Sequence, residues 1–577
     1  MNTIMLRCYF LILFLSLNIW AWGQSFVNAP EYLYTHFDKE FYVAGEDMWF
    51  SVYFVNPQAR QSEIVHVVLY NPAGKEVTKH ILKVEGDRAY GDFILPPKLS
   101  TGYYTFRAYT RWNLNFTPQQ FFSKEIAIYN PETSLEKIQS LEPASYQVAN
   151  TENIRISLEK AQLKPREKVV IKLSSLSQGM GNASISVTDV RYLSTEGKSG
   201  LNNYLQAINA QSPPRLEAGQ QVRDPEKNLE KTFMLRHPDT EENVNSNFVM
   251  GFVKQSQQKL IRVAENGVVE FPLDAFYDST VVQIFDANPF QASYIPLVDP
   301  INKEIATTPP SPNTTTPPMT EAVKFYLQEY QKRFQISKLF GTMDLIRAKQ
   351  VEFKEAQFRP TSIYKVDDFI SLSGMEEFFQ QAIPPVNIKD IKDKQTKIKK
   401  PGFKLYIPHK EANTNNKVVK KQPLLLVNDY FTYDTDAVLN MKWENVETVE
   451  VFNSIENLPM QFGPIGEFGV IAFNTRDGKT PASITDTGNN LMIPGFYRPR
   501  LVNSMDYSSR TYLNSKVPDF RPMIYWNPLI PLQGGAETEI QFSMGDQAGT
   551  YLLRIDGFME NGSKISGEAI IEVSLEP

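Results

Sequence analysis

The histidines are the residues best suited to zinc binding or to acid–base catalysis, and they are spread along the whole sequence. A zinc site needs converging ligands, as in a His-Glu-x-x-His pattern, and a catalytic triad needs a base oriented by a carboxylate. None of the five has such spacing: His36, His66, His80, His237 and His409. The sequence therefore predicts no catalytic residue, no metal ligand and no cofactor.

The single cysteine, Cys8, lies in an apolar run that follows Arg7. This run is shorter than the ~20 residues of a spanning helix, and Ala21 and Gly23 supply the small side chains that a signal peptidase recognises. We predict a signal peptide over residues 1–23 and export to the periplasm or the outer membrane. The mature chain then has no thiol, which excludes disulfides and a thioester formed from a Cys-Gly-x-Gln sequence.

Charge argues against a nucleic-acid partner. Removal of the signal peptide leaves 58 basic and 65 acidic residues, a net charge of −7, whereas phosphate binding needs a clustered cationic surface. One run, residues 389–400, has six lysines and two aspartates. Two interpretations stay open for it: peripheral membrane contact through anionic lipid headgroups, or a solvated loop.

Three glycines, Gly463, Gly466 and Gly469, have a spacing that suggests a phosphate-binding loop. A dinucleotide loop, however, joins a strand to a helix, and these glycines precede the strand pattern from Val470 to Phe473. We expect them to form a tight turn with positive backbone angles.

Aromatic side chains offer the best candidates for contact with a partner protein. Phe520, Tyr525 and Trp526, with Arg521 beside them, have the composition of interface anchors. The alternative is that half of them fill the core of the last sandwich.

The elements that carry these residues are mostly β-strands. Aromatic residues make up 12% of the chain, and they favour pleated, half-buried surfaces. Val65, Val67 and Leu69 form one face of a strand, and Asn71-Pro72-Ala73-Gly74 has the composition of a type I turn. The spacing predicts a β-sandwich over residues 25–132.

One stretch of this sandwich recurs near the other end of the chain. Residues 102–108 read Gly-Tyr-Tyr-Thr-Phe-Arg-Ala, and residues 549–555 read Gly-Thr-Tyr-Leu-Leu-Arg-Ile. Glycine, tyrosine, an apolar residue and arginine are in register, which indicates a repeated module. We expect a C-terminal sandwich over residues 485–577.

Strand patterns also occur over residues 145–300, where we expect one or two further sandwiches with a polar insertion near 200–247. Residues 301–345 combine a Pro/Thr-rich linker, which can bury almost nothing, with a helix. Thr320 can cap this helix, which runs to about Leu339. Its apolar side presents Val323, Leu327 and Tyr330.

A small unit of mixed helix and strand follows over residues 360–478. Its strand Pro423-Leu424-Leu425-Leu426-Val427-Asn428-Asp429 is apolar enough to be buried on both faces. Val446 to Val451 and Phe462 to Ile471 come next, and in this order the three motifs resemble the plug domain of TonB-dependent outer-membrane receptors. That family usually has Asp-Gly where Asn428-Asp429 stands. The residues after Arg476 are too few for a receptor barrel, so the resemblance implies a plug-like domain alone.

The start of the first sandwich resembles a macroglobulin domain. The pattern is Lys39-x-x-Tyr42-x-x-Gly45-Glu46. Residues 519–528 are similar to a segment of exported Gram-negative proteins that combine macroglobulin-like and plug-like domains. These resemblances imply an architecture more than a function.

We therefore expect a mainly β fold: tandem immunoglobulin-like or macroglobulin-like β-sandwiches plus one small α+β plug-like domain. The expected function is non-enzymatic, an exported scaffold or docking protein that assists an outer-membrane transport or assembly machine and binds an outer-membrane protein. Two alternatives stay open. One is a protease-binding macroglobulin without a thioester, with residues 200–247 as bait. The other is a glycan-binding or hydrolytic exported protein.

Overall fold

The computed structural model divides into two compact units, which are described one at a time. The first comprises residues 1–227, 305–351 and 496–577, and the second comprises residues 228–304 and 352–495. The predicted signal peptide, with Cys8, lies outside the described residues. These are 29–132, 146, 148, 151–193, 200–210, 214, 216, 222–237, 240–244, 248–253, 257–273, 275–287, 297–300, 308–340, 349–350, 358–369, 374–392, 399–407, 422–502, 505–509, 512 and 515–575.

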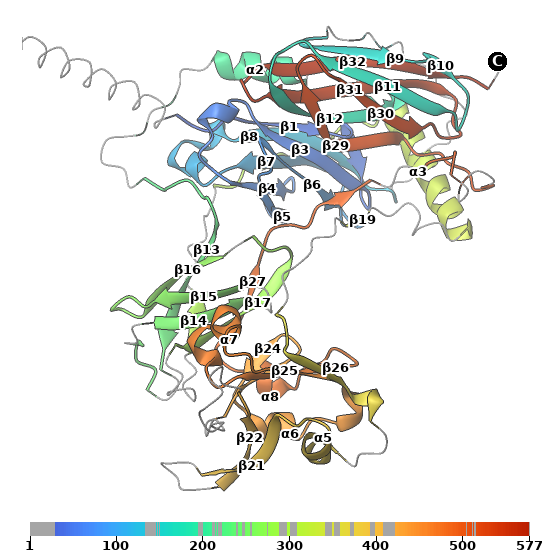
Figure 1. Cartoon of the computed structure of the whole chain (residues 1–577). Helices are drawn as coiled ribbons and strands as arrows, with labels where there is room; N and C mark the ends of the chain where they lie inside the picture. The colour runs from blue at the N-terminus through green and yellow to red at the C-terminus, as the bar shows by residue number, and fades with distance from the viewer. Residues whose placement is uncertain are drawn as a thin grey trace, which may run out of the picture. The chain divides into compact units, whose positions relative to one another are not determined.

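The first unit begins with an eight-stranded β-sandwich (Figure 1). One sheet has the strand order β1-β3-β6 and the other β2-β8-β7-β4-β5. The strands are β1 (Leu33–Phe37), β2 (Phe41–Val43), β3 (Asp47–Phe54), β4 (Ile64–Tyr70), β5 (Glu76–Lys83), β6 (Arg88–Ile94), β7 (Gly102–Tyr109) and β8 (Phe122–Tyr129).

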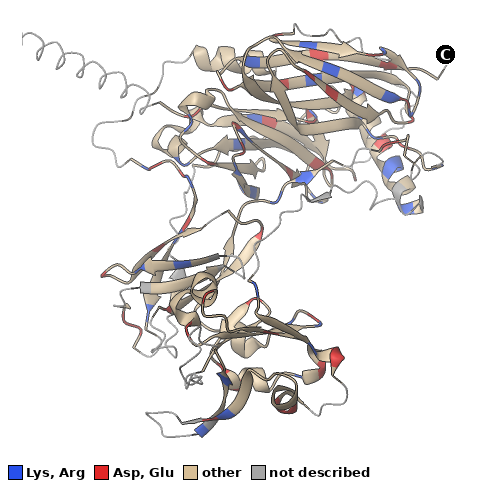
Figure 2. Cartoon of the chain, viewed as in Figure 1, with Lys and Arg blue, Asp and Glu red and all other residues tan. Residues whose placement is uncertain are grey.

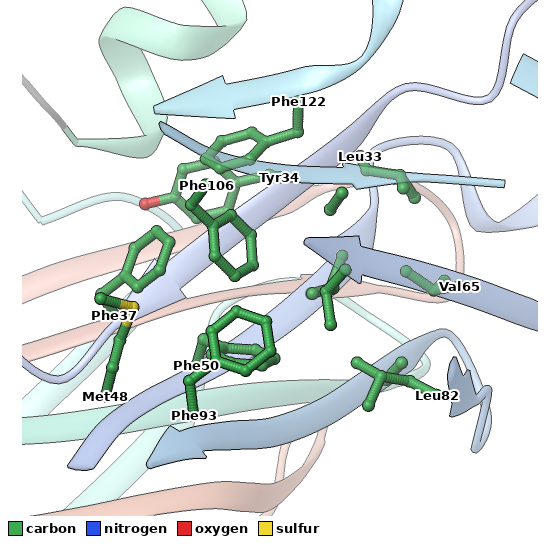
Figure 3. Packing of buried hydrophobic residues seen from close by; sticks show 14 of the residues in the cluster. Leu33, Tyr34, Phe37, Met48, Phe50, Val65, Leu82, Phe93, Phe106 and Phe122 are labelled. Carbon is green, nitrogen blue, oxygen red and sulfur yellow. The ribbon is translucent and has the colours of Figure 1, made fainter. Parts of the chain in front are cut away.

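The core of this sandwich lies between its two sheets. Val65, Val67 and Leu69 are fully buried in it, so the predicted face of their strand is confirmed. The turn that follows is also as predicted, because the Gly74 N–H donates to the Asn71 carbonyl at 2.8 Å and β5 pairs with β4. Figure 3 shows five of the aromatic members of the core, Phe37, Phe50, Phe93, Phe106 and Phe122.

Strands from two distant parts of the chain form the second sandwich. β11 pairs with β30, and β12 lies between β29 and β31. The expectation of an independent C-terminal sandwich over residues 485–577 is therefore wrong, since its strands complete sheets that begin near Ile154. The strands are β9 (Ile154–Leu158), β10 (Gln162–Leu163), β11 (Lys168–Ser175), β12 (Met180–Asp189), β29 (Met523–Gln533), β30 (Glu537–Ser543), β31 (Gly549–Met559) and β32 (Lys564–Val573).

The two sandwiches share one strand order. The second has sheets β9-β11-β30 and β10-β32-β31-β12-β29, which correspond strand by strand to β1-β3-β6 and β2-β8-β7-β4-β5. The two copies of the predicted repeat are β7 and β31. In the first sandwich β7 pairs with β4 and β8, and in the second β31 pairs with the corresponding strands, β12 and β32. The predicted repeat is therefore confirmed. The difference is one connection: β4 and β5 are joined by a tight turn, whereas the whole second unit lies between β12 and β29.

A third sandwich opens the second unit. Its sheets are β16-β13-β18 and β15-β14-β17-β27. The expectation of one or two complete sandwiches within residues 145–300 is thus corrected, because both sandwiches that begin there take strands from later in the chain. The strands are β13 (Leu229–Arg236), β14 (Phe248–Val253), β15 (Gln257–Arg262), β16 (Val268–Leu273), β17 (Ser279–Asp286), β18 (Leu297–Pro300) and β27 (Asn490–Pro494).

The expected polar insertion near residues 200–247 also needs correction. Helix α2 (Leu201–Asn209) begins it, and Leu201 is fully buried in the core of the first sandwich. β13 ends it as the central strand of its sheet, with Phe233 and Leu235 buried. Charged neighbours such as Lys231 hide this alternation in the sequence. Residues 217–221, within this stretch, lie outside the described residues.

The small α+β domain, whose resemblance to a receptor plug stays a prediction, lies between β18 and β27 in the chain, after residues 305–351 of the first unit. Its sheet has the order β20-β25-β26-β23-β24, with β23 parallel to β26. The strands are β20 (Ser362–Lys365), β21 (Val386–Lys392), β22 (Lys399–Leu405), β23 (Leu424–Val427), β24 (Tyr430–Thr432), β25 (Val446–Phe452) and β26 (Val470–Thr475). The helices are α5 (Met375–Gln381), α6 (Thr435–Leu439), α7 (Leu458–Phe462) and α8 (Ala482–Thr485).

Strand β23 is buried on both faces, which confirms the prediction from its apolar run. Leu425 and Val427 pack in a cluster with α5 side chains, and Leu424 and Leu426 pack in a different cluster. This second cluster contains Met250, Phe252 and Phe285 of the third sandwich. One face of the sheet of this α+β domain is therefore covered by the third sandwich.

One glutamine of the third sandwich, Gln283, bonds to the backbone of the edge strand β24. Gln283 Oε1 accepts from the Phe431 N–H at 2.7 Å, and Gln283 Nε2 donates to the Phe431 carbonyl at 3.2 Å. Because unpaired backbone groups on an edge strand can pair with another chain, the amide acts as a neighbouring strand would.

Helix α3 (Glu321–Phe340) belongs to the first unit. The Val323 N–H donates to Thr320 Oγ1 at 3.3 Å, so the predicted cap is confirmed. Val323 and Leu327 are buried in a cluster with Val43 of β2, as their spacing predicts. None of the helices in the described part of the chain combines the length and the apolar character that a transmembrane segment requires.

The Pro/Thr-rich segment before α3 lies along the first sandwich and is not a free linker. The Asn313 N–H donates to the Pro72 carbonyl at 2.8 Å, and the Tyr129 hydroxyl donates to the Pro318 carbonyl at 2.9 Å. Most of its described side chains are exposed, as predicted. Beyond α3, β19 (Lys349–Gln350) pairs with β28 (Arg500–Leu501).

Candidate functional site

Polar side chains fill the contact between the first and second sandwiches. We call this contact the polar interface. It joins the outer face of β1-β3-β6 to the outer face of β12 and β31, and its buried members are Tyr34, His36, Ser51, Tyr53, Ser184, Ser186, Thr188 and Asp556. Contacts between domains of one chain are commonly more polar than domain cores.

Hydrogen bonds cross the polar interface from strand to strand. The Tyr34 hydroxyl donates to Asp556 Oδ2 at 2.8 Å, and the Ser184 hydroxyl lies 2.7 Å from His36 Nδ1. At its margin Asn182 Nδ2 donates to Asp87 Oδ1 at 2.6 Å. Buried polar groups need such partners, and these bonds supply them across the interface for Tyr34, His36 and Asn182.

Burial shifts the protonation of the acids in and beside this interface. It raises the pKa of Asp556 to about 6 against the opposing effect of Arg554. It raises the pKa of Asp38 to about 7, although Lys39 and the Tyr42 hydroxyl favour the carboxylate. The pKa of His36 is lowered well below its usual value, first by burial and then by nearby cations. The charged forms are thus disfavoured by desolvation.

The Lys-x-x-Tyr-x-x-Gly-Glu pattern forms a closed set of contacts after β1. Lys39 Nζ donates to Glu46 Oε2 at 2.8 Å, and the Val43 N–H donates to the same oxygen at 3.0 Å. The Tyr42 hydroxyl donates to Asp38 Oδ1 at 2.6 Å. Gly45, with a φ of +93°, supplies the left-handed residue of this turn. The motif therefore builds a rigid turn.

Helix α3 docks on this turn. The Tyr326 hydroxyl donates to Glu46 Oε1 at 2.6 Å and lies 3.2 Å from Lys39 Nζ. Its ring meets Phe41 edge to face, with centroids 5.1 Å apart. Sequence reasoning missed this role of Tyr326, and the only signal for it was the apolar side of the helix.

Two repeat-related arginines bind segments from outside their own sandwiches. Arg107 Nη1, on β7, donates to the Thr308 carbonyl of the Pro/Thr-rich segment at 2.6 Å. Arg554, at the matching position of β31, donates to the Tyr146 hydroxyl at 3.1 Å and lies 3.4 Å from Glu40 Oε1.

Two of the four connections between the units, near residues 227 and 496, are also held on the first sandwich. His66 Nε2 lies 2.7 Å from Glu226 Oε2, at the end of the outgoing segment. On the returning segment the Tyr497 ring stacks on His80 at 3.8 Å, and Arg500 Nε donates to Asp92 at 2.9 Å. Both segments are thereby fixed within a few residues of the unit boundary.

Within the chain, three residues of the predicted partner-contact group make local contacts, and one of them, Trp526, is buried. Trp526 is buried in the polar interface, with its ring 5.2 Å from His36, and Arg521 binds Asp519 through two 2.7 Å contacts. Tyr525 stacks on Phe542 at 4.6 Å. Only Phe520 is without such a role, and it is half-buried. The partner for Trp526 comes from a strand near the other end of the sequence, which local pattern cannot reveal.

Other candidate groups have local structural roles. Gly463 and Gly469 have φ values of +58° and +82° at the turn before β26, as predicted, whereas Gly466 does not have a positive φ. The lysine-rich run lies in the β21–β22 hairpin, with residues 393–398 outside the described part. Figure 2 shows Lys and Arg interspersed with Asp and Glu in both units.

The described residues contain no group of three or more His, Cys, Asp or Glu placed to hold a metal ion. His36, His66 and His80 lie in separate contacts, and His409 lies outside the described residues. The titratable groups with shifted pKa values in the first unit hold strands, segments and helix together. The chemistry that this arrangement offers is binding between modules.

A scan against protein-family models finds no match, and a search of curated proteins finds none either. Among solved structures the chain is similar to Escherichia coli alpha-2-macroglobulin activated by porcine elastase, with 10% identity and a TM-score of 0.24 over 94% of this chain and 44% of that one. Salmonella alpha-2-macroglobulin reacted with methylamine matches at 10% identity and a TM-score of 0.24, over 95% and 40%.

A DUF4785 family protein from Legionella pneumophila matches at 13% identity and a TM-score of 0.13, over 27% of this chain and 39% of that one. The chain thus spans less than half the length of these proteins. TM-scores this low support no argument about shared fold or function.

Proposed function

We propose that this chain is a non-enzymatic, exported scaffold whose plug-like domain docks on an outer-membrane protein. The observation that supports it best is the nesting of its domains. In the chain the third sandwich lies between β12 and β29 of the second, and the plug-like domain lies between β18 and β27 of the third, after residues 305–351 of the first unit. The plug-like domain is therefore bounded in the chain by strands of folded sheets, β19 before it and β27 after it.

The contacts on the first sandwich support the same proposal. Glu226 with His66, and Arg500 with Asp92, fix the outgoing and returning segments on one sandwich. A load applied to the second unit is therefore carried into folded sheets at these two of the four connections. A spacer that holds a docking domain needs this property, whereas a catalyst needs converging reactive groups in a cleft.

Purification of the tagged full chain in mild detergent, followed by identification of the co-purified proteins, tests the proposal. The expected result is an outer-membrane protein at a fixed ratio to the chain. Ile363→Lys, on the exposed side of edge strand β20 in the plug-like sheet, is expected to reduce its recovery about tenfold or more, as loss of a central contact does.

The matched control is Leu176→Lys. Leu176 is 59% exposed, close to the 58% of Ile363, but it lies in the second sandwich. Recovery of the same partner with this variant is expected to equal that of the unmodified chain. If nothing from the outer membrane co-purifies with the unmodified chain, or if both variants lose the partner equally, docking through the plug-like domain is wrong.

A further inference from the structure

Three side chains with complementary chemistry meet between α2 and the second sandwich. Lys564 Nζ donates to Asn202 Oδ1 at 2.6 Å and lies 2.7 Å from Glu152 Oε2. Asn202 Nδ2 donates to Glu152 Oε1 at 3.1 Å. An amine, an amide and a carboxylate thus form a closed ring, in which the carboxylate contacts both of the other groups.

The backbone holds these groups in place. The Glu152 N–H donates to the Ser566 carbonyl at 2.7 Å, and the Ser566 N–H donates to the Glu152 carbonyl at 3.2 Å. Asn153 Nδ2 donates to the Lys564 carbonyl at 2.9 Å. On the other side Leu201, next to Asn202, is fully buried in the core of the first sandwich. The three groups are therefore presented from fixed elements.

We propose that Lys564 and Asn202 form an isopeptide bond, with Glu152 as the proton carrier. Glu152 removes a proton from the Lys564 ammonium, and the amine attacks Cγ of Asn202. The Nζ–Cγ bond forms and the Cγ–Nδ2 bond breaks. Nδ2 takes this proton from Glu152 and also the second proton that Nζ loses on becoming an amide, and leaves as ammonium. No oxidant, metal or other reactant takes part, and Glu152 returns to its starting state.

The geometry brings the reacting atoms of this step close together. A 2.6 Å contact with Oδ1 places Nζ about 3 to 3.5 Å from Cγ, which is the separation of a near-attack arrangement. The side chains of Lys564 and Glu152 are 29% and 38% exposed, and ion pairs with that exposure contribute little stability by themselves. Departure of ammonia makes the product accumulate even when the step is slow.

The bond joins positions 362 residues apart. It links α2, which is packed on the first sandwich, to β32 of the second. A cross-link over so long a loop restricts the unfolded chain strongly and stabilises the folded one, as in the case of a disulfide. A chain without a thiol in its described residues gains in this way a covalent link between sandwiches.

Intact-mass and peptide-mapping measurements on the full chain test the proposal. The expected mass is lower than the sequence mass by one ammonia, and digestion is expected to yield a branched peptide that joins Asn202 to Lys564. Asn202→Ala, Glu152→Gln and Lys564→Arg are each expected to have the full mass and no branched peptide. An unmodified chain that retains the full mass overturns the proposal.

Lys564→Arg is the matched control, since arginine keeps the charge beside Glu152 but is not a nucleophile. Cyclisation of an asparagine to a succinimide also releases ammonia, and Lys564→Arg retains that loss. A mass deficit that persists in this variant, without a branched peptide, therefore contradicts the isopeptide. Because the result on the unmodified chain is decisive by itself, the test does not depend on how well the variants fold.

Discussion

Tyr34 and Asp556 are hydrogen-bonded at 2.8 Å although 522 positions separate them in the chain. The bond joins β1 of the first sandwich to β31 of the second, at the centre of the polar interface. Asp556 Oδ1 is bound separately by the Ser566 hydroxyl at 2.9 Å. The Tyr34 hydroxyl therefore satisfies the one carboxylate oxygen that faces the first sandwich.

Tyr34→Phe is expected to lower the free energy of unfolding by about 1 to 3 kcal/mol, because it leaves a buried acceptor without its donor. Denaturant unfolding at neutral pH measures this change. Tyr103→Phe, on the half-buried outer side of β7, serves as the control and is expected to change stability by no more than about 0.5 kcal/mol. Equal effects of the two variants would contradict the importance of the bond.

Asp38 predicts a pH dependence with a definite sign. Its pKa is about 7 in the folded chain, against 3.8 for a freely solvated aspartate, so folding favours the protonated acid. The contribution of Asp38 to the free energy of unfolding is fully present below the pKa of the unfolded chain, 3.8. It is lost as the pH rises through the pKa of the folded chain, about 7. In Asp38→Asn the oxygen can still accept from Tyr42 and Trp49, but the titration is absent.

Unfolding free energies of the unmodified chain and of Asp38→Asn, measured from about pH 4 to pH 8, test this sign. The unmodified chain is expected to lose stability relative to the variant as the pH rises across that range. His36, whose pKa is lowered, makes a contribution to the pH dependence of stability that has the opposite sign. This contribution is present in both proteins and cancels in the difference between their profiles. Two parallel profiles would show that Asp38 does not titrate in this range.

Helix α3 is expected to loosen when Tyr326 loses its hydroxyl. Tyr326→Phe removes the bond to Glu46 and the contact with Lys39, at a cost of about 1 to 2 kcal/mol. Hydrogen–deuterium exchange over Glu321–Phe340 is expected to rise in the variant. Phe334→Ala, at a 52% exposed position of the same helix, is the control and should leave exchange near β2 unchanged.

Gln283→Leu is expected to destabilise the second unit selectively. The variant leaves the N–H and the carbonyl of Phe431 without their partner, at about 1 to 3 kcal/mol for each buried group. The loss of stability is measured by thermal unfolding, with hydrogen–deuterium exchange of β23 and β24 as the readout. Exchange in β3 and β4 of the first unit should not change. Gln381→Leu, at an exposed position of α5, is the control. Equal loss in both units would contradict the assignment.

Local pattern predicted the elements well where one face or both faces are buried. The alternation of Val65, Val67 and Leu69 and the continuous run around Leu425 each specify burial by themselves, and both predictions are confirmed. The repeat predicted that β7 and β31 hold equivalent positions. Each of these signals lies within a few consecutive residues.

Pairing across the insertions could not be predicted in the same way. Nothing near Val169 specifies that its strand pairs with the one that holds Phe542, because backbone hydrogen bonds carry no sequence information. Trp526 looked like a surface anchor for the same reason, since its neighbour His36 belongs to a distant strand. Resolving such partners requires knowledge of which strands share a sheet.

The interrupted second sandwich has a consequence for biosynthesis. Strands β9 to β12 leave the ribosome long before β29 to β32, and in the finished fold β11 and β12 pair with those late strands. Domains usually fold as they are made, from the N-terminal end. This one must wait for the last strands to be translated, so a premature stop before Met523 leaves the half-made sheets with exposed edges that invite aggregation.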